Sequence, residues 1–498
     1  MTSLMTSCQA RPPIGRYGPQ DADQEAAVAG VAIAGGGFAG LMTSILLARR
    51  GHEVTVIERD PPPAWEPSGP PTVDDDAEVD AWRRAGAPQC RQSHVLLARA
   101  RRVLVEEAPD VLDALLASGV REQAANVGAG DVPGEAMLLG RRLVTEAVIR
   151  GFADREPRVT VRSGDAVTAL VAVDGAVPVV TGVRTQSGEV LAADLVVDAG
   201  GRRSALPGWL ADLGARPPVD EEQPLGFFYL TRFYRVRPGC AMPVMRVPGS
   251  VPLDYATVIA FGGDSDTFSL TITLSVEDPH RTAMRDPVKH RQFLAAVPMA
   301  AEWLEIGDPI SDIAVMARIE NRRRRLVDPD GPVVGGLVPI GDASLHTNPT
   351  LGRGTAMAFW QGQQLANRMA DPWEPIGLVD EMDRWTQENL GIWYDTQAAA
   401  DAAGIVRLEA GIRGERLPMP DDPMARFVAG AMALAPTDPA VGSAVTRVVH
   451  LLASPMEAFG ATDVAQRVTE FLETEPDLEP HPEGPTRAAF EAIATGAA

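Results

Sequence analysis

The sequence has little positive charge and no long apolar run. Its 498 residues contain a single lysine, Lys289, and the net charge at pH 7 is −22. Nucleic acids and anionic membranes are bound by clustered basic residues, so this charge balance argues against both as partners. No stretch of about 18 apolar residues occurs, which excludes a membrane-spanning helix.

Cysteine is also scarce. Cys8, Cys90 and Cys240 are too few and too dispersed for a disulfide framework or a metal site, and a reducing cytoplasm is the expected location. Apolar residues make up 45% and charged residues 22% of the chain, so most of it can bury a core. Residues 1–28 are rich in proline and acids but lack the apolar core of a secretory signal, and we expect a disordered leader there.

A segment near the N-terminus has the order strand, glycine turn, helix, strand. The turn contains Gly35, Gly37 and Gly40. The first glycine permits a tight turn, the second lets the backbone approach a pyrophosphate, and the third permits close packing of helix on strand. The free N–H groups at the start of the helix, at Phe38 and Ala39, attract the anion. This pattern predicts a dinucleotide site.

Glu58 closes the second strand of this unit. A carboxylate there accepts the hydroxyls of an adenosine ribose and repels a 2′-phosphate, and the neighbouring Arg59 is assigned to the same site. The predicted ligand is therefore FAD or NAD rather than NADP.

A second glycine-rich segment far along the chain favours FAD. Asp342 follows a strand and can bind ribityl hydroxyls, while Pro349, Gly352 and Gly354 form a loop that opens a helix. N–H groups at such a helix end suit the pyrimidine edge of a flavin and stabilise the charge of its reduced form. NAD has no group for this second site.

With these motifs the sequence resembles the FAD-dependent monooxygenases of the aromatic-hydroxylase (p-hydroxybenzoate hydroxylase-like) fold, and within it an actinobacterial branch of secondary metabolism that includes polyketide epoxidases. The resemblance covers roughly residues 30–395. It implies that Gln92 lies beside the flavin and that Arg142 opens a helix near the cofactor phosphate or ribityl chain. It also implies a flavin C4a-hydroperoxide as oxidant, with O2 and an apolar small molecule as substrates.

The middle motif of that family, Asp-Gly followed by Ser and Arg, is altered here. If Ser204 is the motif serine, Gly200 stands at the aspartate position and Pro207 at the arginine position. This change argues against direct reduction by NAD(P)H. The expected electron donor is NAD(P)H, used either directly or through a separate flavin reductase.

Three other activities remain open. A flavin-dependent reductase of unsaturated, isoprenoid-like substrates uses the same fold without oxygen, and a flavin-binding protein without turnover is a further alternative. Related halogenases resemble one another in a lysine that captures hypohalous acid, but Lys289 lies in a segment expected to start a surface helix, capped by Asp286 with Pro287 first.

Two sets of residues along one strand compete for the substrate pocket. We assign Tyr229, Thr231 and Phe233 to the substrate, although the alternate residues of the strand, or a purely apolar core, fit the pattern as well. His346 is the candidate catalytic residue because it lies between Asp342 and the glycine loop. The arginine run 322–325 either pairs with nearby acids or holds an anionic substrate.

The expected fold is α/β, with a Rossmann-like FAD-binding domain interleaved with a mixed β-sheet substrate domain. The predicted FAD-binding domain comprises residues 29–205 and 333–385, the substrate domain residues 206–332, and a helical C-terminal region residues 386–498. Residues 95–116 and 136–154 are predicted to be helices, and the β-type runs between 159 and 197 antiparallel hairpins.

Overall fold

The computed structural model describes residues 28–65, 69–72, 74–127, 129–243, 249–419, 421–475 and 484–497. Apart from Val28, the leader predicted over residues 1–28 lies outside the described residues.

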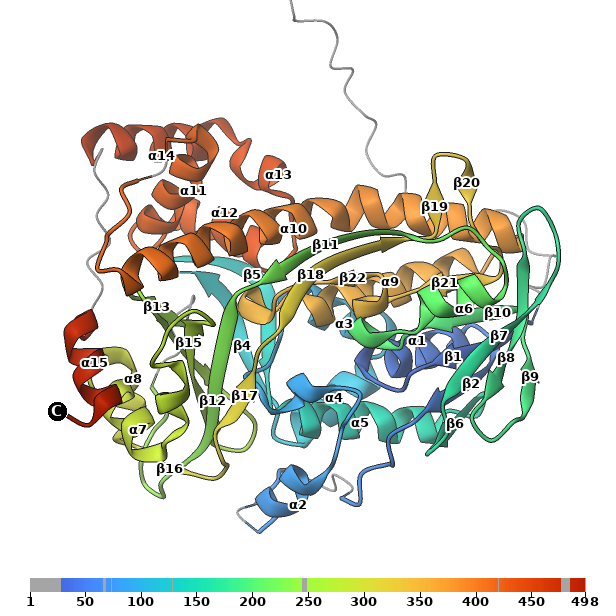
Figure 1. Ribbon diagram of the computed structural model, residues 1–498, viewed down its shortest axis with the longest axis horizontal. Coiled ribbons are helices and arrows are strands. Elements are labelled where there is room, and N and C mark those ends of the chain that lie inside the picture. The colour runs from blue at the N-terminus through green and yellow to red at the C-terminus, as the bar shows by residue number, and fades with distance from the viewer. Residues whose placement is uncertain are drawn as a thin grey trace, which may run out of the picture.

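A parallel sheet of five strands, in the order β21-β10-β1-β2-β6, lies in the right half of Figure 1. All neighbouring strands run parallel, so their carboxyl ends meet at one edge, where α/β sheets bind ligands. The strands are β1 (Gly30–Ala34), β2 (Glu53–Glu58), β6 (Val159–Ser163), β10 (Leu195–Asp198) and β21 (Leu337–Pro339).

Helices cover this sheet and bring the two glycine-rich segments together. Helix α1 contacts both α5 and α9, and α3 packs on α9. Because α1 lies between neighbours on nearly all sides, its apolar residues are not confined to one stripe. The helices are α1 (Phe38–Arg49), α3 (Ala98–Glu107), α4 (Pro109–Ala117), α5 (Arg142–Arg155) and α9 (Gly354–Arg368).

A second, antiparallel sheet has β12 in its interior. Along β12 the side chains of Phe228, Leu230 and Tyr234 face an apolar core formed with α7 and α8, and Asp286 caps α7 as predicted. The strands are β12 (Phe227–Val236), β13 (Ser250–Pro252), β14 (Thr257–Gly262), β15 (Thr267–Ser275), β16 (Gly307–Pro309) and β17 (Ala314–Met316), and the helices are α7 (Pro287–Ala295) and α8 (Pro298–Leu304).

A third sheet of three strands, in the order β11-β18-β22, connects the other two. It contains β11 (Val219–Leu225), β18 (Ile319–Arg325) and β22 (Leu345–His346). Arginines of β18 face acids of β11 in register, with ion pairs Arg322–Glu222 at 2.9 Å, Arg323–Glu221 at 2.6 Å and Arg324–Asp220 at 2.8 Å. The arginine run therefore pairs with acids rather than with an anionic substrate.

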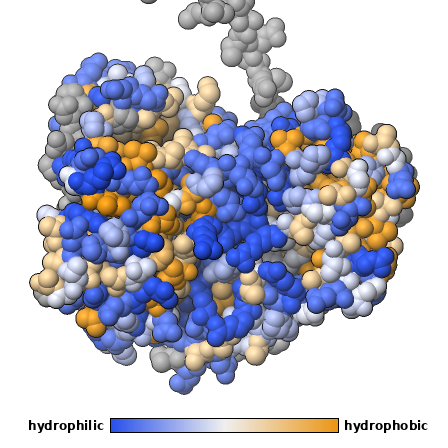
Figure 2. All heavy atoms as spheres, viewed as in Figure 1, coloured by the Kyte–Doolittle hydropathy of each residue, from blue (hydrophilic) through white to orange (hydrophobic). Residues whose placement is uncertain are grey.

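The C-terminal part of the described chain is helical. Figure 1 shows α10 running along the top of the molecule, where it contacts β11 and β18. The face in Figure 2 has a hydrophilic central band between apolar patches. The helices are α10 (Pro375–Ile412), α11 (Pro423–Leu434), α12 (Pro439–Val449), α13 (Pro455–Phe459), α14 (Thr462–Thr474) and α15 (Arg487–Thr495). Within the described residues, no helix has the length and apolar character needed to cross a membrane.

Two secondary-structure predictions were wrong in part. Residues 136–139 belong to β5 rather than to a helix, and Val95–Leu96 form β3, because these short apolar runs pair with each other across the chain. Of the runs predicted as hairpins, the first, β6, and the end of the last, β10, instead join the parallel sheet, whereas residues 190–192 at the start of that last run pair antiparallel as predicted. The remaining elements are α2 (Asp76–Ala81), β3 (Val95–Leu96), β4 (Arg121–Val127), β5 (Gly130–Leu139), β7 (Val167–Val173), β8 (Val179–Thr185), β9 (Val190–Ala192), β19 (Val327–Asp328) and β20 (Gly331–Pro332).

Candidate functional site

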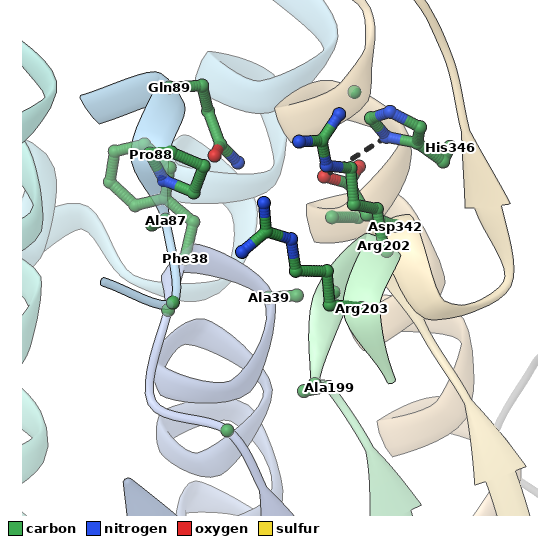
Figure 3. A pocket seen from close by; sticks show the side chains of 18 of the residues that line it. Phe38, Ala39, Ala87, Pro88, Gln89, Ala199, Arg202, Arg203, Asp342 and His346 are labelled. Atoms are coloured by element: carbon green, nitrogen blue, oxygen red, sulfur yellow. Dashed lines mark ion pairs between the residues drawn. The ribbon is translucent and has the colours of Figure 1, made fainter. Parts of the chain in front are cut away.

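A cavity lies at the carboxyl edge of the parallel sheet, and Figure 3 shows part of its lining. The residues predicted to hold the cofactor converge there from both glycine-rich segments. Those that line the cavity are Gly35, Gly37, Phe38, Ala39, Glu58, Arg59, Gln92, Arg142, Asp342, Pro349, Gly352 and Gly354. His346, predicted as the catalytic residue, lines it as well, whereas Gly40 does not.

The three glycines of the N-terminal turn have different surroundings. A Cβ on Gly35, at φ +115°, would lie 2.4 Å from the Ala199 carbonyl oxygen, and one on Gly40 would lie 1.9 Å from the Gly35 carbonyl oxygen. These two positions therefore require glycine for packing. A Cβ on Gly37 would meet nothing closer than Arg142 Nη2 at 3.7 Å. Gly37 thus keeps a space open at the start of α1, beside the cavity.

Glu58 is held in place by the turn that it faces. Its Oε2 accepts from the Gly36 N–H at 2.7 Å and its Oε1 accepts from the Asp60 N–H at 2.8 Å. The Arg84 guanidinium lies 3.3 Å from Oε2. Burial alone raises the pKa of Glu58, but Arg84 and the two N–H donors outweigh it and lower that pKa below its usual value. Glu58 therefore presents a fixed carboxylate to the cavity.

Arg84 was not predicted from the sequence. Its buried side chain lies among Glu58, Asp60 and Glu146, at 3.3, 3.0 and 2.7 Å. Arg84 also donates to the Gly36 carbonyl at 3.1 Å, so it links its own segment to the glycine turn. No local pattern marks it, because its acids come from two other elements.

The two glycine-rich segments form two backbone cradles, the first at residues 35–40 and the second at residues 341–354. The second cradle packs against the first. Gly341 has φ +57°, and a Cβ there would lie 2.9 Å from the Ala39 Cβ of α1. Gly352 has φ +65°, and a Cβ there would lie 2.8 Å from Val95 Cγ1, so a side chain at either position is excluded. A Cβ on Gly354 would meet only Asp342 Oδ1, at 3.6 Å. The backbone at the start of α9 is therefore accessible from the cavity.

Asp342 and His346 face each other at the cavity wall, with 3.4 Å between Oδ2 and Nδ1 (Figure 3). Burial raises the pKa of Asp342, but His346, Arg142 and Arg202 together lower it below its usual value. Within the described part of the chain, neither ring nitrogen of His346 has a hydrogen-bond partner. Both nitrogens are buried in the cavity wall, with Nδ1 next to Asp342.

His94 also lines the cavity. Its ring stacks on Phe38 with centroids 5.3 Å apart, and its Nε2 lies 3.3 Å from Thr355 Oγ1 at the start of α9. Burial, with a contribution from Arg142, lowers the pKa of His94 to about 3. Arg142 opens α5 as predicted and lies over the other ring of this stack, 4.6 Å from the Phe38 centroid.

The altered middle motif forms the turn after β10. Asp198 is fully buried and accepts from Ser204 Oγ at 2.5 Å and from the Gly200 N–H at 2.9 Å, so it stabilises the turn itself. Figure 3 shows Arg202 and Arg203 extending from this turn into the cavity. Their position at a strand end of the parallel sheet is the signal that could have identified both.

The residues predicted to contact the substrate lie behind the cavity wall. Tyr229 and Thr231 face away from the apolar core of their sheet, but neither lines the cavity, and Phe233 lines a separate, smaller pocket. Thr231 Oγ1 donates to Gln92 Oε1 at 2.6 Å. From the second and third sheets, the apolar side chains that line the cavity are instead Phe261, Met316 and Ile319.

Replacing Tyr229 with phenylalanine tests what its hydroxyl does. The hydroxyl donates to Asn348 Oδ1 at 2.6 Å and lies 2.9 Å from Thr350 Oγ1. Because Tyr229→Phe leaves a buried acceptor without its donor, we expect unfolding free energy to fall by about 1–3 kcal/mol in urea denaturation. An unchanged free energy would indicate that this bond contributes nothing to stability.

The cavity fits FAD in its charges and in its glycine positions. Glu58 suits a ribose, and the start of α9 suits the edge of a flavin. Arginines from four segments suit a pyrophosphate, namely Arg59, Arg84, Arg142 and the pair Arg202 and Arg203. A Cβ on Gly37 would occupy the space through which the backbone meets the cofactor.

Comparisons with known proteins agree with this geometry. Residues 30–72 match the FAD dependent oxidoreductase family model. The chain is 28% identical over 366 residues to protein Rv3254 of Mycobacterium tuberculosis, covering 67% of this chain and 71% of that one.

Two solved structures show the same fold. A flavin-dependent brominase superposes with a TM-score of 0.59 at 16% identity, covering 88% of this chain and 98% of that one. The anhydrotetracycline hydroxylase OxyS of Streptomyces rimosus superposes with a TM-score of 0.54 at 17% identity, covering 86% of this chain and 76% of that one. Residues 30–72 therefore resemble the FAD dependent oxidoreductase family, and the described chain has the fold of the FAD-dependent monooxygenases of the aromatic-hydroxylase type.

Proposed function

We propose that the protein is a monooxygenase that uses FAD and O2 to hydroxylate or epoxidise an apolar small molecule of secondary metabolism. One observation carries the proposal: two glycine-rich segments from distant parts of the chain line one cavity, and Phe261, Met316 and Ile319 line it as well. The bound flavin, once reduced, would supply the chemistry with O2.

In this proposal the protein binds and orients rather than transferring protons through a triad. Glu58 accepts the adenosine ribose hydroxyls, and Arg142 with the N–H groups at Phe38 and Ala39 binds the pyrophosphate. Asp342 accepts the ribityl hydroxyls, and the N–H groups of Arg353 and Gly354 hold the pyrimidine edge. Gln92 lies beside the ring, and the apolar wall excludes water from the substrate.

Oxygen incorporation tests the proposal. Protein with reduced FAD and a panel of polyketide and aromatic substrates should consume O2 and place one ¹⁸O atom from ¹⁸O2 in the product. The principal alternative is a reductase of unsaturated, isoprenoid-like substrates, which would saturate a double bond under anaerobic conditions without any ¹⁸O label. Oxidation of the flavin without product in either assay would contradict both.

We propose that electrons come from NAD(P)H, either directly or through a separate flavin reductase. The rate of anaerobic flavin bleaching by NADPH or NADH alone, compared with the rate after adding a flavin reductase, distinguishes the two routes. The turn that replaces the usual motif, closed by Asp198 and Ser204, favours the separate reductase.

Halogenation is the weaker alternative. The only lysine, Lys289, lies on α7 and donates to the Ala494 carbonyl, and it is not among the residues that line the cavity.

We also propose residues 29–205 with 333–385 as the FAD-binding domain and residues 206–332 as the substrate domain.

Removing the His346 side chain tests its proposed contact with substrate or with reacting oxygen. We expect His346→Ala to lower turnover by about a hundredfold, the lower end of the usual effect of one positioned polar group. FAD content, measured by absorbance per protein, should stay at the wild-type value. Loss of FAD from the variant would instead indicate that His346 supports the cofactor through Asp342.

A further inference from the structure

The loop that the proposed function assigns to the flavin edge is held from behind by the long C-terminal helix α10. Arg353, in the middle of this loop, is buried, and its guanidinium points away from the cavity. Its Nη1 donates to the Trp393 carbonyl at 3.1 Å and to Thr396 Oγ1 at 3.2 Å, both on α10. The Arg353 guanidinium also lies 5.4 Å from the Trp393 ring centroid.

Asp401, two turns further along α10, is the centre of a second set of contacts. Its Oδ1 accepts from Asn348 Nδ2 at 2.7 Å and from Gln397 Nε2 at 3.0 Å. Its Oδ2 accepts from Asn321 Nδ2 at 2.9 Å. The exposed fraction of Asp401 is 3%. A buried carboxylate is therefore surrounded by amide donors from three different elements.

Asn348 is the residue through which this network reaches the loop. Besides Asp401, it bonds Thr350 Oγ1 at 2.8 Å through Nδ2, accepts from Tyr229 at Oδ1, and donates its own N–H to Asn321 Oδ1 at 2.7 Å. Every polar group of the Asn348 side chain is thus used. The chain leaves Asn348 directly into Pro349 and Thr350, so the start of the loop has one permitted position.

Burying the charged groups of Asp401 and Arg353 costs free energy. Burial raises the pKa of Asp401, because the amide donors, although they favour the carboxylate, do not fully replace water. Burial also lowers the pKa of Arg353 to about 10. Buried charges of this kind are a poor source of stability and are better suited to specifying one geometry.

We infer that Asp401 is a positioning residue, which acts through Asn348 to hold the loop from Pro349 to Gly354 in the conformation that binds the flavin half of the cofactor. The inference rests on the proposed FAD site, and it gives a role to a residue of the region predicted to be C-terminal and helical. Asp401 itself does not line the cavity.

The two halves of FAD provide the test. In the proposed site, FAD would contact both the glycine turn and the loop from Pro349 to Gly354, whereas ADP would contact only the glycine turn and Glu58. We expect Asp401→Asn in the full-length apoprotein to raise the Kd for FAD by about tenfold or more, the effect of losing a hydrogen bond to a charged group. The Kd for ADP should stay within about twofold of wild type. Isothermal titration calorimetry with each nucleotide measures both.

Two outcomes would overturn the inference. Equal weakening of FAD and ADP would show that Asp401 only supports the fold, and unchanged binding of both would show that the loop does not depend on it. If wild-type protein binds neither nucleotide, the proposed FAD site fails instead, so the two failures are distinguishable. Asp395→Asn is the matched control, because Asp395 lies on the same helix but its side chain is 58% exposed and pairs with Arg323.

Two further variants separate the route and guard against misfolding. If Asp401 acts through Asn348, Asp401→Asn should cause no further loss of FAD affinity in the Asn348→Ala background. The double variant should therefore have the same Kd for FAD as Asn348→Ala alone. Thr396→Val removes one bond from α10 to Arg353 and keeps the side-chain shape. We expect it to weaken FAD by a smaller factor with ADP again unchanged, and equal effects on both nucleotides would contradict the inference.

Discussion

Gly37→Val should abolish FAD binding while the protein still folds. The backbone at Gly37 has φ −87° and ψ −170°, an extended conformation that valine adopts readily. Its Cβ would lie 3.7 Å from Arg142 Nη2 and 4.0 Å from Arg84 Nη2, the ends of two flexible side chains. The added methyl groups would occupy the space that a pyrophosphate needs, and we expect affinity for FAD to fall by at least about a hundredfold.

Absorbance at 450 nm per protein and the thermal unfolding midpoint measure the two parts of this prediction. Gly40→Ala is the contrasting variant, because its Cβ would lie 1.9 Å from the Gly35 carbonyl oxygen. That variant should lose the folded state itself. If Gly37→Val protein remained yellow at wild-type stoichiometry, the cofactor would have to lie elsewhere.

Acidification from pH 7 to pH 5 should destabilise the protein strongly. Burial lowers the pKa of His94 to about 3 and those of His290 and His450 to about 4. The unfolded chain binds protons at these histidines below about pH 6.5, whereas the native state keeps them neutral. Their stabilisation is therefore present above pH 6.5 and is lost as the pH falls toward 4. Each histidine should cost about 2 kcal/mol between pH 7 and pH 5.

The combined loss of unfolding free energy from the three histidines is comparable to the whole stability of a typical domain, about 5–15 kcal/mol. Urea denaturation at pH 7, 6 and 5 measures it. His450→Asn is the informative variant: His450 Nδ1 accepts from the Ala98 N–H at 3.2 Å, and an asparagine oxygen can accept the same bond without titrating. Its pH-dependent loss should be smaller by about 2 kcal/mol. A stability that does not change between pH 7 and pH 5 would contradict the assignment of buried neutral histidines.

The residues that we propose for the cofactor could be selected from the sequence because each belongs to a local pattern. Gly35 and Gly37 follow a strand, Glu58 ends one, and Gly354 opens a helix, so neighbouring residues carry the signal. Arg84 has no such pattern, since its partners Glu58 and Glu146 are 26 and 62 residues away. Sequence periodicity likewise limited the substrate prediction to two faces of β12, and neither face lines the cavity.

The helices and strands show the same limit. The short apolar run at residues 136–139 fits either helix or strand, and only its pairing with β3 and β4 makes it a strand. β6 joined the parallel sheet for a similar reason, because its partner β2 lies far from it in sequence.

From its order of residues alone, the chain specifies two glycine-rich turns, the acids beside them and the caps that start its helices, because backbone torsion and short-range hydrogen bonds depend on adjacent residues. Only packing in three dimensions joins the turns into one cavity, sets Arg84 against Glu58 and brings Asp401 of α10 to Asn348. These contacts connect segments whose spacing along the chain has no period, so no local pattern encodes them.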